Sequence, residues 1–310
     1  MPQPKHIHLL RENNYQWVNA TQNTLCEINW LKKNFDFDPL DLKDCLPPNN
    51  RPKLLERRDY LFLTLLFPIY NRPTREIKAV EVDFFIGQNF LVTCHDSQLP
   101  PLRDFFALCQ KDTEMFAHLL SGGPAALLYE LLNRLTEYCF PMLAHLNNDV
   151  NQIESQIFTA PGPKLIREIA LIKKNIVNFR QAMQTHKNLI YRLMEAGDRL
   201  LPGQKLELRF KNLVEQSKEI WDTLENCQNT VNALYETHAS LASYQLSQII
   251  KTLTIISVIF MPINLLAFIF GMNTVYHPLV GQPADFWLII ALMAVVAGVL
   301  ILIFKKKRWW

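Results

Sequence analysis

Hydrophobic residues are spread unevenly along this chain of 310 residues, and the two longest uncharged runs lie near its C-terminal end. The runs are Thr252–Phe270 and Phe286–Phe304. A helix needs about 20 apolar residues to cross the hydrocarbon core of a bilayer, so each run is long enough to be a membrane span. The pattern therefore predicts a transmembrane hairpin made of a first span, an external loop and a second span, at residues 251–273, 274–285 and 286–304.

Basic residues flank the outer ends of both runs. Lys251 precedes the first run, a basic cluster follows the second, and the loop between them has Asp285 as its one charged residue. The basic cluster consists of Lys305, Lys306, Lys307 and Arg308. Because Lys and Arg remain on the cytoplasmic side, we expect a cell-membrane protein with both termini cytoplasmic and 305–310 as a basic tail. The alternative is a tail anchor without a transport role.

The N-terminal part has the pattern of an α/β domain, which we place at residues 1–120. Runs rich in β-branched and aromatic residues predict strands, whereas TLCEINWLKKNF has helical spacing. The strand runs are YQWVNA, DYLFLTLLFPIY, KAVEVDFFIG and NFLVTCHD. Residues 121–203 combine helical periodicity with short Gly/Pro joints, which predicts an antiparallel helical layer on the α/β domain. The helices expected around these joints span 102–120, 125–158 and 165–196.

No Gly or Pro occurs between Gly203 and Pro262, so the sequence predicts one helix from about residue 205 through the first span to Phe270. We call its part at 204–250 the stalk. An apolar stripe with coiled-coil-like spacing predicts the packing face of this helix. The apolar stripe consists of Leu213, Ile220, Leu224, Cys227, Val231, Leu234 and Leu241.

A second stripe on the same helix steps by alternating threes and fours and is polar almost throughout before the membrane. We call it the polar stripe; it consists of Asp222, Glu225, Asn229, Asn232, Glu236, Ser240, Ser243, Ser247, Ile250, Thr254, Ser257, Met261, Asn264, Phe268 and Gly271. In a lone helix this would be the solvated face. Ser257 and Asn264 fall at bilayer depth, however, where a polar side chain normally faces a protein interior or a water-filled path. Several copies around an axis would place this face on a pore.

Composition and the absence of known motifs argue against several functional classes. The net charge of +3 is small and its basic excess adjoins the membrane, which gives no support for a nucleic-acid partner. Six cysteines without a C-x-x-C pair fit a reducing cytosol better than a disulfide framework or a zinc site. The chain has no Gly-rich phosphate loop, H-E-x-x-H or G-x-S-x-G motif, so we expect neither an enzyme nor a resident cofactor.

The first span resembles that of the CorA-type divalent cation channels, of which the ZntB proteins are a branch. The similarity rests on KTLTIISVIFMPINLLAFIFGMN, and it extends to DPLDLKDCLPPNNRPKLLERRDYLFLTLLFP and VDFFIGQNFLVTCHD. It implies an α+β membrane protein: a homopentameric funnel with an N-terminal α/β/α cytoplasmic domain, a stalk continuing into the pore-lining first span, and an outer second span. It also implies transport of Mg²⁺, or of Zn²⁺, Co²⁺ or Ni²⁺ in some branches.

The resemblance assigns roles to individual residues. Gly271, Met272 and Asn273 would form the selectivity filter, with Asn273 holding the hydrated cation and Gly271 allowing either a close backbone approach or a positive φ. Together with the polar stripe, the resemblance also assigns a pore lining, an apolar gate, an acidic ring that could bind the metal ion, and a basic collar. These are Ser257, Met261, Asn264 and Phe268 for the lining, Ile250 and Leu253 for the gate, Glu236 for the ring, and Lys305, Lys306, Lys307 and Arg308 for the collar. Leu253 and Thr254 are alternative candidates for the gate position on one helical turn, and periodicity does not distinguish between them.

Several positions depart from the family pattern. Phe270 replaces a usual Tyr, Asn264 a usual Thr and Phe268 a common Gly, and the loop lacks the family's Met-Pro-Glu-Leu. On the stalk, Asn212 stands where magnesium-transporting members often have a regulatory Asp. The cation, its direction, any proton coupling and control by Mg²⁺ therefore remain open. The alternative function is a non-conducting structural or regulatory membrane protein, because a bulky ring such as Phe268 can seal a narrow path by dewetting.

Overall fold

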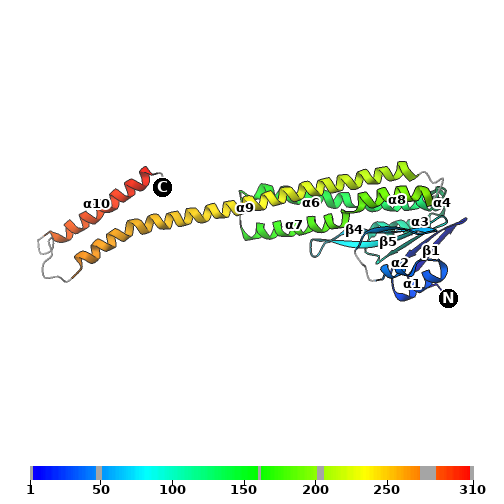
Figure 1. Cartoon of the computed structure of the whole chain (residues 1–310). Helices are drawn as coiled ribbons and strands as arrows, with labels where there is room; N and C mark the ends of the chain where they lie inside the picture. Colours follow the sequence, from blue (N-terminus) through cyan, green and yellow to red (C-terminus); the bar gives the residue numbers. More distant parts are fainter. Residues whose placement is uncertain (1–2, 47–50, 160–161, 201–205, 273–283, 308–310) are drawn as a thin grey trace. The chain divides into compact units, whose positions relative to one another are not determined.

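The computed structural model describes most of the chain, apart from short segments at both ends and at four internal positions (Figure 1). The described ranges are 3–46, 51–159, 162–200, 206–272 and 284–307. By its internal contacts the chain divides into two compact units, Met1–Tyr235 and Glu236–Trp310. We call them the soluble unit and the membrane unit, and one helix, α9, has residues in both.

A mixed six-stranded sheet forms the centre of the soluble unit, in the order β1-β2-β6-β5-β4-β3. The strands are β1 (Ile7–Glu12), β2 (Tyr15–Ala20), β3 (Lys53–Glu56), β4 (Tyr60–Asn71), β5 (Glu76–Gly87) and β6 (Phe90–His95). Only β2 and β6 pair in parallel, and the other neighbours are antiparallel. The long hairpin β4–β5 is buried on both faces for most of its length, which explains its near-continuous run of apolar residues.

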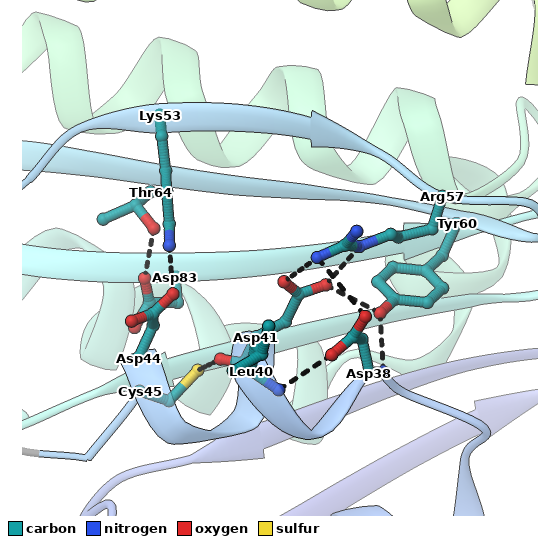
Figure 2. Close-up of polar contacts among 10 residues, drawn as sticks. All are labelled: Asp38, Leu40, Asp41, Asp44, Cys45, Lys53, Arg57, Tyr60, Thr64 and Asp83. Carbon is teal, nitrogen blue, oxygen red and sulfur yellow. Dashed lines mark hydrogen bonds and ion pairs between the residues drawn. The ribbon is translucent and has the colours of Figure 1, made fainter.

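Two short helices, α1 (Leu25–Asn34) and α2 (Pro39–Asp44), cover one face of the sheet. Phe37, just before α2, stacks on Phe85 of β5 with ring centroids 4.2 Å apart. A buried ion pair anchors α2: Asp41 accepts two hydrogen bonds from the Arg57 guanidinium and one from Tyr60 (Figure 2). This face of the sheet is therefore held by aromatic packing and by one desolvated carboxylate.

Helices cover the other face of the sheet, where the larger hydrophobic core lies. The helices are α3 (Pro100–Lys111), α4 (Thr113–Leu120), α5 (Pro124–Glu137), α6 (Cys139–Gln156), α7 (Pro163–Met183) and α8 (His186–Leu200). Their starts follow local rules: α3, α5 and α7 begin at a proline, and the side chain of Asp112 caps α4 by accepting from the Met115 amide at 2.9 Å. Gly123 enters α5 at a φ of 78°, which a side chain would strain.

The predicted architecture is confirmed, with differences in its details. Each of the three helices expected at 102–120, 125–158 and 165–196 is broken into two, and the breaks lie at Asp112, Tyr138 and Gln184–Thr185. Asp112 ends one helix and caps the next, a role that an Asp takes readily. The strands β1 and β3 were not predicted, because IHLLRE and KLLE lack the β-branched and aromatic enrichment of the other strands. The six-residue helix α2 was not predicted, because it is too short to show helical periodicity.

The prediction of one uninterrupted helix across the stalk and the first span is confirmed: α9 is Leu206–Phe270 and passes through Pro262. The second apolar helix is α10 (Asp285–Lys306). Both are long and apolar enough to cross a membrane. The apolar stripe is a core face, as predicted, since its first six members are buried and Leu241 is half-buried.

Candidate ion pathway

The polar stripe lies on the uncovered side of α9. From Asp222 to Gly271 every member is exposed, with the exception of Asn232, which is half-buried. Six of the seven members of the apolar stripe on the same helix are buried within the soluble unit. The two stripes therefore occupy different faces of α9, as their spacing predicts.

In the membrane unit, α9 and α10 each have one partly covered face. On α9 the covered residues recur every three or four positions, and so do those of α10. They include Ile255, Ile259, Pro262, Ile263, Leu266 and Phe270 on α9, and Ile289, Met293, Val296, Ala297, Gly298, Leu300 and Phe304 on α10. Since these are the two helices that the structure describes in this unit, each covers the other.

The polar stripe is on the side of α9 that faces away from α10. At 100° per residue, Ser257, Met261, Asn264 and Phe268 fall within about 40° of the direction opposite the covered face. Met261 and Phe268 are 77% and 74% exposed. The first span therefore has one apolar face for its partner helix and an opposite face that carries the polar groups.

Hydroxyl groups on this face are bonded to the helix itself. Thr254 Oγ1 donates to the Ile250 carbonyl at 2.8 Å, and Ser257 Oγ donates to the Leu253 carbonyl at 2.9 Å. A hydroxyl that donates in this way keeps its acceptor lone pairs, so it can accept a hydrogen bond from the water of a hydrated ion. Leu253 and Thr254 lie on either side of the line from Ile250 to Ser257, and both are exposed. Both therefore stay candidates for the gate residue on this turn.

The end of α9 shows why Gly271 suits its position. The Gly271 amide donates to the Ala267 carbonyl at 2.9 Å, and the Met272 amide to the Ile269 carbonyl at 3.4 Å. A Cβ at position 271 would lie 3.0 Å from the Ala267 oxygen, tighter than ordinary packing allows. Gly271 does not have a positive φ, so of the two reasons predicted for a glycine here, the close backbone approach applies. Asn273 lies outside the described residues.

The remaining predicted residues lie at the two ends of the spans. Glu236 is exposed on α9 at the start of the membrane unit, and Asn212 is exposed in the soluble unit. Lys305, Lys306 and Lys307 are exposed at the end of α10, whereas Arg308 lies outside the described residues. Among the residues that the structure describes, no three His, Cys, Asp or Glu side chains are grouped so that they could hold a metal ion.

These features define a two-span membrane protein in which a soluble α/β domain is joined to the first span by a continuous helix. The chain belongs to the family described as CorA-like Mg²⁺ transporter protein, whose profile matches residues 12–306. It is thus a member of a divalent metal transporter family and not an enzyme.

Individual relatives agree with this assignment. The cobalt/magnesium transport protein CorA of Thermotoga maritima is 24% identical over 295 residues, which cover 94% of this chain and 83% of that protein. The complete structure of the CorA magnesium transporter from Methanocaldococcus jannaschii has a TM-score of 0.84 at 21% identity, covering 97% of this chain and 93% of that one. The ZntB cytoplasmic domain from Vibrio parahaemolyticus has a TM-score of 0.61 at 14% identity, covering 75% of this chain and 90% of that one.

Proposed function

We propose that this protein conducts hydrated divalent cations, with Mg²⁺ as the first candidate and Zn²⁺, Co²⁺ and Ni²⁺ as alternatives. The path runs along the axis of a ring of identical copies, whose α9 helices turn their polar stripes inward. The observation that carries the proposal is the position of Ser257 and Asn264: they are polar, lie at bilayer depth, and face away from α10. One stripe cannot enclose a path, so the protein acts as a ring, for which the family resemblance indicates five copies.

Neutral oxygens suit such a cargo. Mg²⁺ releases its water ligands reluctantly, and a site that serves it usually leaves several of them in place. Hydroxyl and amide oxygens accept hydrogen bonds from these waters without replacing them. The filter proposed at Gly271, Met272 and Asn273 works in this way at the outer end, while Glu236 concentrates cations at the inner end and the basic cluster after α10 marks the cytoplasmic side.

Cysteine substitution tests the path. In a Cys26→Ser background, which removes the exposed thiol, Ser257→Cys on the polar stripe is compared with Val258→Cys, one residue away and off the stripe. In proteoliposomes loaded with a Mg²⁺ or Co²⁺ indicator, a charged water-soluble thiol reagent should label Ser257→Cys and stop its flux. The flux of Val258→Cys should not change.

Four results would contradict parts of the proposal. Equal labelling of both variants would mean that the polar stripe faces water no more than position 258 does. Asn273→Ala with normal assembly and unchanged flux would remove the filter. A wild-type protein that passes none of the divalent cations would favour the alternative, a non-conducting regulatory protein. Native mass spectrometry in detergent that shows only monomers or dimers would exclude the ring.

A further inference from the structure

A buried carboxyl lies in the middle of the sheet of the soluble unit. Asp83, on the inner strand β5, is 2% exposed. The strand register places it in a row with Lys53, Thr64 and Cys94, because Lys53 pairs with Thr64, Thr64 with Asp83 and Asp83 with Cys94. Paired residues in such a row share one face of the sheet. Here it is the face under α2, whose C-cap residue is Cys45.

The bonding partners of Asp83 are neutral. The Thr64 hydroxyl donates to Asp83 Oδ1 at 2.6 Å (Figure 2). The Cys45 thiol, which lies beside Asp83, donates to the Asp41 carbonyl at 3.4 Å. Lys53, the cation of the row, forms an ion pair with Asp44 and lies over the Phe62 ring at 5.2 Å from its centroid. Within the described part of the chain, Asp83 has no ion pair.

The other charged groups around Asp83 do not supply a countercharge. On its own strand, Glu81 faces the same side and is 8% exposed. α2 contributes Asp44 and the Cys45 thiol, β3 the Lys53 that Asp44 binds, and β6 the Cys94 thiol. His95 points to the opposite face, where its Nε2 is 2.8 Å from Asn19 Oδ1. The cavity beside Asp83, of about 350 Å³, is lined by polar, acidic and thiol groups and by His95, and its described lining includes no Lys or Arg. The acidic and thiol groups are Glu81, Asp83, Asp96, Cys45 and Cys94.

An ionised carboxylate in such a place is costly, because burial removes its water and Lys53, the nearby cation among the described residues, is paired with Asp44. Burial accordingly raises the pKa of Asp83 to about 8, and the nearby Glu81 adds to the rise, while the hydrogen bond of Thr64, the neighbouring Cys45 thiol and the charge of Lys53 act in the other direction. The neutral acid is therefore the form that this packing fits.

We propose that Asp83 is a proton-binding site of the soluble unit: the protonated form holds α2 on the sheet, and loss of the proton at alkaline pH loosens α2. The cavity beside the carboxyl offers water a route to the charge that forms there. The proposal concerns the soluble unit alone and does not depend on conduction. It would allow the state of this unit to follow the pH on its own side of the membrane.

The direction of the pH effect on the opening of α2 follows from proton linkage. The pKa of Asp83 in the fold, about 8, lies above the ordinary pKa of an aspartate, 3.8, so between these values the closed state binds the proton more tightly than an open, solvated state. The stabilisation is complete below the lower value and is lost as the pH rises through the higher one. Opening of α2 should therefore increase, by at most about tenfold per pH unit, up to pH 8 and level off beyond it.

Hydrogen exchange of α2 in the full-length protein tests this expectation. Asp83→Asn keeps the size of the side chain and cannot ionise, and the sequence of α2 is the same in both proteins, so their intrinsic exchange rates cancel in a ratio. We expect the ratio of wild-type to variant exchange in peptide 38–46 to rise roughly tenfold or more between pH 6 and pH 8. The control Asp59→Asn, which removes an exposed carboxylate outside this peptide, should retain the pH dependence of the wild type.

A second measurement covers the case in which Asp83→Asn does not fold. Infrared difference spectra of the wild-type protein should show a protonated carboxylic acid band that disappears between pH 6.5 and pH 9.5. No such band, or an exchange ratio that does not change with pH, would overturn the proposal. Failure of ion flux in the same preparation would affect only the transport proposal, since neither readout uses transport.

Discussion

Removing the Asp41 carboxylate should loosen α2 far more than a surface ion pair could. Asp41 is fully buried, and it receives hydrogen bonds at 2.9 and 2.6 Å from Arg57 and at 2.7 Å from Tyr60 (Figure 2). Breaking a buried pair typically costs about 3–5 kcal/mol. Arg57 is 31% exposed and can regain water, so we take about 2–4 kcal/mol for Asp41→Ala. Arg57→Met should cost more, because it leaves the buried carboxylate with only Tyr60.

The assay is hydrogen exchange of the α2 amides in the full-length protein, such as the Leu42 amide, which donates to the Asp38 carbonyl at 3.1 Å. A loss of about 3 kcal/mol corresponds to roughly 150-fold faster exchange. Asp44→Ala is the matched control, since its ion pair with Lys53 is about 30% exposed on both sides and should be worth less than about 1 kcal/mol. If Arg57→Met changed exchange no more than this control does, the argument from the buried charge would be refuted.

Two further predictions concern the positions where the chain departs from its family. Phe268→Gly should raise divalent flux while the assembly persists, because a ring of apolar side chains at a constriction favours an empty path; the control is Phe260→Gly, which is exposed on the same span but off the polar stripe. Loss of the assembly without any gain of flux would instead place Phe268 in a packing contact. Asn212→Asp should introduce protection of α9 from proteolysis by millimolar Mg²⁺, since a carboxylate binds the ion better than an amide does. Strong protection of the wild type by Mg²⁺ would contradict the expectation that Asn212 weakens regulation of the protein by Mg²⁺.

The helix α9 could be predicted from the sequence because the patterns that indicate it are local. A stretch without Gly or Pro, two stripes at helical spacing and an uncharged run are all properties of neighbouring residues, and they predicted both the helix and its two faces. The same reasoning could not choose between Leu253 and Thr254, since a rotation of half a residue exchanges them. It also joined α3 to α4, because the capping role of Asp112 depends on where the chain turns.

The Asp83 site could not have been found in this way. The run KAVEVDFFIG predicts a buried strand correctly, but the neighbours of Asp83 come from β3, β4, β6 and α2, all of which lie outside this run. Which residue stands opposite which is fixed by the register of three strand pairs, and a shift of one residue would move Asp83 to the other face. The one available signal was an Asp within an apolar run, which is unusual for a buried strand.

Asn264 gives the strongest physical reason why the membrane unit should not remain a single copy. Thr254 and Ser257 satisfy their own donors by bonding to the preceding turn, but within the described residues the Asn264 amide has no such partner. In lipid, an unpaired amide would cost about 2–7 kcal/mol, and α10 cannot relieve this cost because it covers the opposite face of α9. Water enclosed by several copies, or the amide of a neighbouring copy, would satisfy it. Asn264→Leu should therefore weaken association, whereas a change at Thr252, whose hydroxyl is bonded to Gln248 and which lies off the stripe, should not.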